Sequence, residues 1–270
     1  MQVFRVIIVG LLLSSPASAQ DSGLQMLTQR DDIFGLEAVG RFDLGGGSCS
    51  GALIAPDLVL TAAHCLFDMS KKRPQDLSKA TFRAGLRDGK ALFESKVLRA
   101  VARPAYEPFQ QFSWEGVKQD VALVQLVDRV NTAVISPYAI ENAPPQGSKI
   151  SLVSYGRGRS EAPSWQKECR IQERDSEGLV LSCNSTFGSS GAPVFSDAGR
   201  RRRIVSIISG GGQIQGQKLA FGMVLPKAVA ELKRALRSGR GVIEAEHQSV
   251  RRKGLDINGK SNIGAKFQQP

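Results

Sequence analysis

The stretch STFGSSGAPVF, residues 185–195, combines a glycine-flanked pair of serines with an apolar segment that follows immediately. Such a stretch is either a flexible surface connector or a tight turn that projects one serine hydroxyl as a nucleophile. Gly188 and Gly191 favour the turn, because glycine permits backbone angles and close approaches that other residues do not. Ser189 and Ser190 are then the two candidate nucleophiles, and the rest of the sequence has to decide between them.

The chain has 270 residues, 41% of them hydrophobic and 23% charged, as expected for a globular protein with a buried core. Residues 1–19 have the layout of a secretory signal peptide, with one positive charge, the apolar run VIIVGLLL and small residues before an expected cleavage after Ala19. This run is too short to span a membrane, which needs about twenty apolar residues. We therefore expect an exported protein, secreted or periplasmic, without a membrane span. Residues 20–34 are an N-terminal segment or a possible pro-piece.

The four cysteines are expected to form disulfides, because export places them in an oxidising compartment. Four cysteines allow three connectivities, and proximity in the sequence favours Cys49 with Cys65 and Cys169 with Cys183. The second pair would face each other across a hairpin whose turn lies near Ser176–Glu177. A metal site is not expected, since the chain has no C-x-x-C pair and only two histidines.

Residues 37–225 read as about a dozen short apolar or alternating segments, most of them separated by Gly, Pro, Asp or Asn. This pattern predicts an all-β barrel or sandwich architecture. A helix is expected at residues 226–238, which open on a proline, carry an apolar stripe on one face and end before Gly239. Residues 239–270 have little apolar content and no periodicity, so we expect a disordered basic tail.

The net charge of +11 raises the question of a nucleic-acid partner. The sequence contains no basic helix with interleaved aromatic residues, and aromatic residues make up only 6% of it. A role in solubility or at an anionic surface is favoured over specific nucleic-acid recognition. The glycine runs GGGSCSG and SGGGQ open no helix and carry no P-loop lysine, so they do not indicate phosphate or nucleotide binding.

His64, in the stretch LVLTAAHC, is the candidate general base, since the other histidine, His247, lies in the presumed tail. A Cys49–Cys65 disulfide would restrain the loop that carries it. Asp120 begins the apolar stretch DVALVQL and is either a turn residue or a partly buried charge. A histidine base needs an acid that fixes its tautomer, and this need favours the second interpretation.

The motifs TAAHC, DVALVQL and GSSGAP, in this order, resemble the His, Asp and Ser motifs of the chymotrypsin-like (trypsin-like) serine endopeptidases. The likeness is greatest to the bacterial secreted branch, which includes the glutamyl endopeptidases, and it covers residues 35–238. It implies two six-stranded antiparallel β-barrels with a C-terminal α-helix. In the family pattern G-D-S-G-G-P the third residue is the nucleophile, so the resemblance implies a triad of His64, Asp120 and Ser190.

The same resemblance implies the surroundings of the triad. The N–H groups of Gly188 and Ser190 would form the oxyanion hole, and Ser209 would lie behind the aspartate. The strand edge 208–212, with Gly210 and Gly211, would pair with the substrate backbone, and Asn184 would lie at the base of the primary pocket.

Three positions depart from relatives of known specificity. Ser189 replaces the aspartate that receives the new N-terminal ammonium in trypsin-like enzymes, so we expect a pocket built without that switch. Asn184 is neutral and does not support a preference for Arg or Lys. Ile208 stands where glutamyl endopeptidases have a histidine, so that specificity is not supported either. We expect Phe221 to close one wall, which would favour small or apolar side chains.

The resulting hypothesis is an exported, monomeric serine endopeptidase that acts on a protein or peptide substrate without a cofactor. The alternative is a catalytically inactive binding protein with the same fold. Such proteins usually lose a member of the triad, whereas all three residues are present here.

Overall fold

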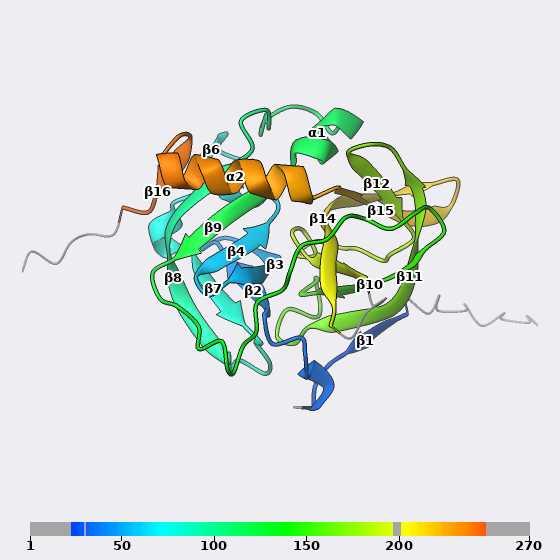
Figure 1. The fold of residues 1–270 in the computed structure, drawn as a ribbon, viewed down its shortest axis with the longest axis horizontal. Helices are drawn as coiled ribbons and strands as arrows, with labels where there is room; N and C mark the ends of the chain where they lie inside the picture. The colour runs from blue at the N-terminus through cyan, green and yellow to red at the C-terminus, as the bar shows by residue number, and fades with distance from the viewer. Residues whose placement is uncertain (1–22, 30, 197–200, 247–270) are drawn as a thin grey trace, which may run out of the picture.

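The computed structural model describes residues 23–29, 31–196 and 201–246, and strands dominate it (Figure 1). The strands form two closed barrels, which lie side by side and follow one another along the chain. The expected signal peptide, the end of the tail and His247 lie outside the described residues. Among the described helices, none is long and apolar enough to cross a membrane.

The first barrel is antiparallel and has six strands in the order β8-β7-β2-β3-β4-β9, with β8 and β9 closing it. Most of its inward positions are Val, Leu, Phe or Ala; in the last strand, ALVQL, four of five residues are buried. The strands are β2 (Val39–Asp43), β3 (Ser48–Ala55), β4 (Leu58–Thr61), β7 (Thr81–Ala84), β8 (Phe93–Ala102) and β9 (Ala122–Leu126).

The second barrel repeats this architecture in the order β11-β10-β13-β14-β15-β12, closed by β11 and β12. The expected fold of two six-stranded antiparallel barrels is therefore confirmed. The strands are β10 (Lys149–Ser154), β11 (Ser164–Arg174), β12 (Gly178–Leu181), β13 (Pro193–Ser196), β14 (Arg203–Ile214) and β15 (Gln217–Met223).

Short elements complete the described part of the chain. A small ribbon pairs β5 (Phe67–Asp68) with β6 (Arg73–Pro74). Three 3-10 turns are η1 (Asp31–Ile33), η2 (Ala63–Leu66) and η3 (Leu77–Lys79).

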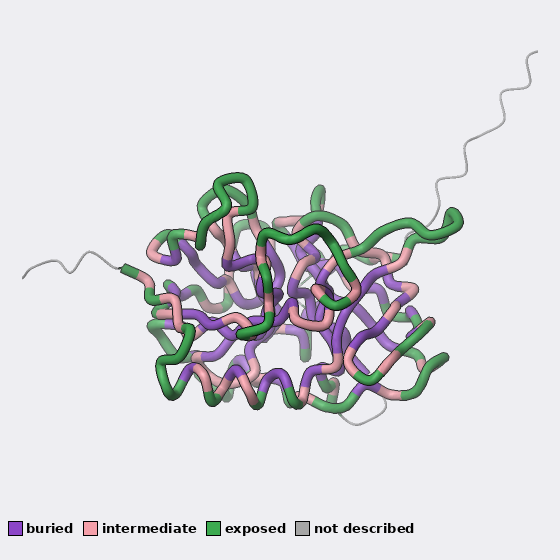
Figure 2. The backbone as a smooth tube through the Cα atoms, turned by 90° about the horizontal axis from the view of Figure 1, so that it is seen from above, coloured by how far each residue is buried: buried purple, intermediate pink, exposed green. Residues whose placement is uncertain are grey.

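The barrels share a buried interior, visible as the purple segments of Figure 2, while most connecting loops are exposed. Tyr155, at the end of β10, is fully buried, and its hydroxyl donates to the carbonyl of Leu86 in the first barrel, 2.9 Å away. Packing and hydrogen bonding thus fix the two barrels against each other, which matters because the candidate site lies between them.

The C-terminal helix α2 (Pro226–Ser238) is confirmed at the expected residues. It begins with proline in its first turn and ends at Gly239, whose φ of 72° is the left-handed conformation that glycine adopts readily. Val229, Leu232 and Leu236 are buried where the helix covers strands β8 and β9 (Figure 1).

A second helix, α1 (Trp114–Gln119), was not expected from the sequence. Its six residues are too few to display a helical period. Its N-terminus is capped by Ser113, whose hydroxyl accepts from the N–H of Gly116 at 3.0 Å. Asp120 is the residue at its C-terminal end.

The expected domain boundary at residue 238 is wrong, because β16 (Val242–Glu244) pairs with β8 beyond the helix. A three-residue strand is too short to produce a recognisable pattern, and its pairing with β8 is non-local. At the other end, β1 (Leu24–Met26) pairs with β11, and Leu27 is buried. Part of the possible pro-piece therefore packs against the second barrel.

Both expected disulfides are confirmed. Cys49 joins Cys65 with 6.4 Å between the Cα atoms, and Cys169 joins Cys183 with 5.1 Å. The second disulfide lies at the base of the β11–β12 hairpin, whose turn lies between Arg174 and Gly178, as expected.

The substitution Leu232→Ala should lower the free energy of unfolding by about 2–5 kcal/mol, because it leaves a cavity between α2 and the first barrel. Urea denaturation with the disulfides intact measures this change. Arg234→Ala, on the exposed face of the same helix, is the control and should change stability by less than about 0.5 kcal/mol. Equal effects of the two variants would contradict the docking of this helix.

Candidate active site

The site lies at the junction of the two barrels. His64 belongs to η2, directly after β4, and Asp120 follows α1. Ser190 comes from the second barrel, in the turn before β13, and Ser209 comes from β14. Neither barrel alone contains the whole set.

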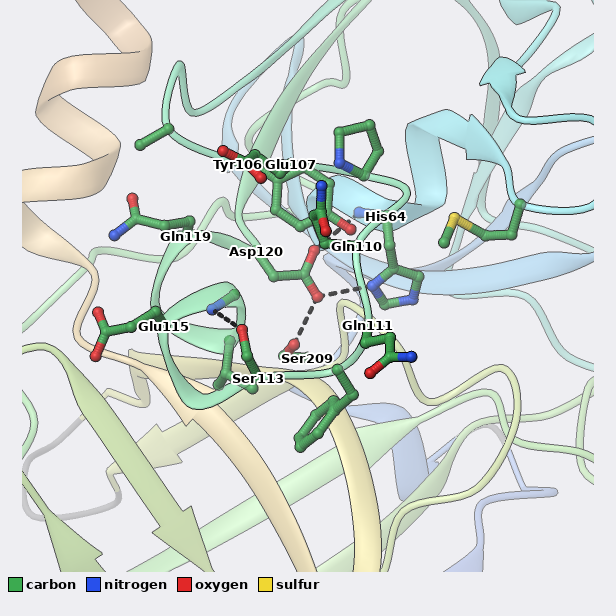
Figure 3. Close-up of a pocket in the computed structure, with 16 residues that line it drawn as sticks. His64, Tyr106, Glu107, Gln110, Gln111, Ser113, Glu115, Gln119, Asp120 and Ser209 are labelled. Atoms are coloured by element: carbon green, nitrogen blue, oxygen red, sulfur yellow. Dashed lines mark hydrogen bonds and ion pairs between the residues drawn. The ribbon is translucent and has the colours of Figure 1, made fainter.

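His64 and Asp120 are joined by two hydrogen bonds (Figure 3). The ring Nδ1 lies 2.7 Å from Oδ2 of Asp120, and the backbone N–H of His64 donates to Oδ1 at 2.8 Å. Ser209 donates its hydroxyl to Oδ2 at 2.6 Å, across the barrel junction. An ionised carboxylate only accepts hydrogen bonds, so Nδ1 carries the proton and Nε2 is left as the basic nitrogen.

The environment of His64 acts on its pKa in two opposite directions. Burial disfavours the charged imidazolium and lowers the pKa, whereas the charge of Asp120 and its hydrogen bond raise it. Burial is the largest single effect, but the charge and the hydrogen bond of Asp120 together outweigh it, so the pKa of His64 lies above its ordinary value of 6.5. The ring is 26% exposed and can be reached from the surface, while the Asp120 side chain is 5% exposed.

The turn around the two serines requires glycine on both sides. Gly188 has a φ of 88° and Gly191 a φ of 75°, both in the left-handed region. A Cβ at Gly188 would collide with the carbonyl of Tyr155, and one at Gly191 would collide with Ser50 and Thr61 of the first barrel. The turn can approach the first barrel this closely only because Gly191 has no side chain, and the missing side chain of Gly188 lets the turn pack against the end of β10.

The backbone amides of the turn divide into two kinds. The N–H of Ser189 donates to the carbonyl of Thr186 at 2.9 Å. The N–H groups of Gly188 and Ser190 donate to no other residue in the described part of the chain. Two unpaired amides that flank a serine hydroxyl are the arrangement that stabilises an oxyanion.

Of the two candidate serines, only Ser190 is accessible. Ser189 is fully buried, and its hydroxyl contacts the N–H of Thr186 and the hydroxyl of Ser154, each at 3.3 Å. Ser190 and His64 both line a cavity of about 440 Å³. Within the described residues no hydrogen bond joins Ser190 to His64, and such bonds often tighten only when a substrate is present.

Ser50 was missed by the sequence reasoning, although it connects the turn to the first barrel. Its hydroxyl donates to the carbonyl of Gly188 at 2.8 Å and accepts from the N–H of Tyr155 at 2.9 Å. Its own N–H donates to the carbonyl of Ser190 at 2.8 Å. Nothing in the local sequence distinguishes this serine from its neighbours, because its partners lie more than a hundred residues away.

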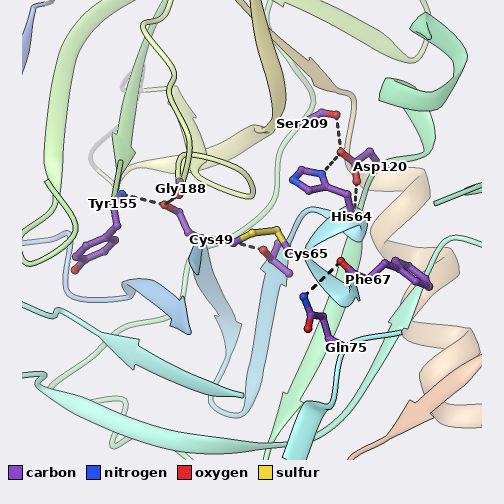
Figure 4. The surroundings of a disulfide bond; sticks show 11 residues. Cys49, His64, Cys65, Phe67, Gln75, Asp120, Tyr155, Gly188 and Ser209 are labelled. Carbon is purple, nitrogen blue, oxygen red and sulfur yellow. Dashed lines mark hydrogen bonds and ion pairs between the residues drawn. A yellow bond between two sulfur atoms is a disulfide. The ribbon is translucent and has the colours of Figure 1, made fainter. Parts of the chain in front are cut away.

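The disulfide Cys49–Cys65 connects the elements that carry Ser50 and His64 (Figure 4). It joins β3 to η2 within the first barrel and so restrains Ser50 relative to His64. The sulfur atoms of the two cysteines lie close to a ring nitrogen of His64, as in a metal site. Because both sulfurs are bonded to each other, they are not thiolates and offer no metal ligands.

The expected substrate-binding residues occupy two segments. Gly210 and Gly211 lie in β14 and pair with β15 on one edge of that strand. On the opposite edge, β13 pairs with β14 only as far as Ile207, and beyond it this edge has no partner strand among the described residues. Asn184 donates its N–H to Oε1 of Gln166 at 2.7 Å. The free edge of β14 starts beside Ser209 and is available for an extended peptide.

Phe221, expected at a wall of the primary pocket, is 8% exposed. Its ring lies 5.5 Å from that of Phe112 and 6.4 Å from that of Trp114, measured between ring centres. A Cβ at Gly212 would come within 3.6 Å of this ring. The aromatic contacts connect β15 with the loop and helix that precede Asp120.

A family model described as "Trypsin-like peptidase domain" matches residues 49–201, which include the histidine, aspartate and serine motifs. The chain belongs to the trypsin-like peptidase family. This family membership agrees with the resemblance expected from the three motifs.

Several curated members of the family are similar to this chain. A glutamyl endopeptidase of Bacillus licheniformis is 26% identical over 158 residues, which cover 57% of this chain and 47% of the relative. The serine protease SP24D of Anopheles gambiae is 30% identical over 170 residues, which cover 55% of this chain and 58% of the relative. The chain spans about half the length of the curated relatives it matches.

A solved structure of a Glu endopeptidase in complex with MPD superposes with a TM-score of 0.67 at 16% identity. The match covers 81% of this chain and 98% of the other. At this identity the likeness establishes the fold of the trypsin-like peptidase domain.

The pKa of His64 should decrease in an Asp120→Asn variant, because burial would then act without the opposing charge. Proton NMR titration of the imidazole Cε1–H signals measures both values. The chain has only two histidines, so His247→Asn assigns the other signal and serves as the control. A His64 pKa that is the same in wild type and Asp120→Asn would contradict the electrostatic coupling of these two residues.

Proposed function

We propose that this trypsin-like peptidase is an exported serine endopeptidase that hydrolyses peptide bonds through a triad of His64, Asp120 and Ser190. The observation that carries the proposal is the convergence at one barrel junction of a histidine oriented by a buried carboxylate, an accessible serine hydroxyl and two unpaired amides. This combination serves acyl transfer, which needs a base, a nucleophile and an oxyanion site in fixed relation.

In the proposed reaction, the hydroxyl of Ser190 attacks the carbonyl carbon of the scissile bond while Nε2 of His64 takes its proton. The negative charge that develops on the carbonyl oxygen accepts hydrogen bonds from the N–H groups of Gly188 and Ser190. His64 then gives the proton to the leaving amine as the carbon–nitrogen bond breaks. Water repeats the sequence on the acyl-enzyme and regenerates the free serine.

Asp120 does not take up the proton in this scheme. It keeps the proton of His64 on Nδ1 and stabilises the imidazolium that forms during each half-reaction. Ser209 supports this role by donating to the same carboxylate oxygen at 2.6 Å. The acyl part of the substrate would extend along the free edge of β14, at Ser209, Gly210 and Gly211, with Asn184 at the base of the primary pocket.

The turn Gly188–Gly191, which we call the oxyanion turn, is held in place without the ammonium–aspartate pair of trypsin-like enzymes. Ser189, at the position of the aspartate, is uncharged and bonds only to neutral groups of the second barrel. Ser50 fixes the carbonyls of Gly188 and Ser190 from the first barrel. We infer that activity does not depend on a newly created N-terminus.

Export to an extracellular or periplasmic compartment is part of the proposal. The apolar N-terminal stretch with its small-residue cleavage site supports it. Two disulfides, one of them next to the candidate base, also support an oxidising environment.

A fluorophosphonate probe should label the wild-type protein at one residue, Ser190, as located by peptide mapping in a mass spectrometer. Ser190→Ala should abolish labelling and lower kcat for peptide cleavage by about 10⁶-fold, because the nucleophile is lost. The matched control is Ser189→Ala, which should still be labelled. A folded wild-type protein that is neither labelled nor active on a mixed peptide library would instead be a binding protein with a peptidase fold.

A further inference from the structure

The cavity of about 440 Å³ beside Ser190 is lined largely by residues that have no role in the proposed triad. Its walls include the Cys49–Cys65 disulfide, the oxyanion turn and the segment around Arg157. No residue of β14 lines it. If the acyl part of a substrate follows β14, this cavity lies on the other side of the nucleophile, where the leaving amine departs.

Arg157 is held at the wall of this cavity by Phe187, the residue before Gly188. Its guanidinium carbon lies 4.2 Å from the centre of the Phe187 ring, within the range of a cation–π contact. Its backbone N–H donates to the carbonyl of Phe187 at 2.7 Å. Both contacts are to the residue next to the oxyanion turn, so the charge is positioned relative to the reacting carbonyl.

The loop that carries Arg157 is fixed at several other points. The N–H of Arg159 donates to the carbonyl of Gly156 at 2.8 Å. Arg41, on β2 of the first barrel, donates to the carbonyl of Ser160 at 2.9 Å and pairs with Glu161 at 2.6 Å. A fixed loop loses little conformational entropy when it binds a ligand.

Arg157 is the charged side chain at the wall of this cavity. No ion pair joins it to a carboxylate of the described residues, and no aspartate or glutamate lines the cavity. The larger cavity that His64 also lines, about 820 Å³, has the opposite character, with Glu107, Glu115 and Asp120 and neither lysine nor arginine. The two sides of the catalytic imidazole thus differ in the sign of their charge.

We propose that the cavity around Arg157 selects substrates with an acidic side chain within the first two residues after the scissile bond. The inference rests on the proposed endopeptidase function and adds a substrate class to it. The guanidinium would bind the carboxylate through charge-assisted hydrogen bonds, while the face stacked on Phe187 keeps it oriented. Arg157 would then be a specificity residue, separate from the catalytic steps.

Three otherwise identical peptide series, with Glu, Gln or Lys at the first or second position after the scissile bond, test the proposal through kcat/KM. At the position where Glu is preferred, the wild-type kcat/KM for the Glu peptide should be about five times that for the Gln peptide, which is the effect of a partly exposed ion pair. The Lys peptide should have the lowest kcat/KM, because its charge is repelled by Arg157. Raising the salt concentration from 0.05 to 0.5 M should reduce the ratio of Glu to Gln, because the pair is screened.

The variant Arg157→Gln should bring the ratio of Glu to Gln close to one, with cleavage of the Gln peptide retained. Arg157→Lys should retain part of the preference, since lysine keeps the charge but not the planar, bidentate geometry. Phe187→Leu should give an intermediate ratio, because the stacking that orients the guanidinium is lost. Arg234→Gln, which removes a positive charge from the exposed face of α2, is the matched control and should leave the ratio unchanged.

The outcomes separate the two proposals. Cleavage and fluorophosphonate labelling with equal rates for the Glu and Gln peptides would overturn the role of Arg157 and leave the peptidase function intact. A preference for Glu that persists in Arg157→Gln would overturn it as well. Absence of both labelling and cleavage would overturn the proposed function, and this inference with it.

Discussion

The contact between Ser50 and the turn that carries Gly188 and Ser190 is the interaction on which the geometry of this site depends. Ser50 lies in the first barrel, and its hydroxyl and N–H hold the carbonyls of Gly188 and Ser190 in the second. Each peptide unit is planar and joins the carbonyl of one residue to the N–H of the next, so these bonds fix the Gly188–Ser189 and Ser190–Gly191 units. The unit between them carries the N–H of Ser190. The unpaired N–H of Ser190 therefore lies between two peptide units that the first barrel holds, while the unit that carries the N–H of Gly188 is held through its carbonyl by the N–H of Arg157.

The position of His64, the proposed base, also depends on contacts across the barrel junction. Asp120 receives bonds from His64 in the first barrel and from Ser209 in the second, and the carboxylate is almost completely buried. Burying a charge is unfavourable unless hydrogen bonds compensate for the lost water. Here three bonds do so, and one of them fixes the tautomer of the imidazole.

The two cavities that meet at His64 differ in charge. The cavity with Arg157 and the cavity with Glu107 and Glu115 lie against the same imidazole, yet they carry opposite charges. In the proposed reaction, an extended peptide would meet negative charge before the scissile bond and positive charge after it. The proposed substrate choice would then depend on residues on both sides of the bond that is cut.

The sequence predicts the elements whose patterns are local, and it misses those created by distant contacts. Alternation in the β-strands, the apolar stripe of α2 and the motifs around His64, Asp120 and Ser190 are all contained in a few consecutive residues. The helix α1 and the strand β16 are too short for any period, and β16 exists only because β8 accepts it. Ser50 looks like an ordinary serine beside a cysteine, and only the folded chain reveals its partners.

The most direct test of the central claim is the kinetics of Ser50→Ala against those of Ser95→Ala. Ser95 is also buried and hydrogen-bonded, but it contacts Asp128 in the first barrel. If Ser50 holds the oxyanion turn, Ser50→Ala should lower kcat at least about tenfold with little change in KM, because the lost alignment acts on the transition state. Ser95→Ala should keep its kcat. A Ser50→Ala protein that retains the wild-type kcat would contradict the account.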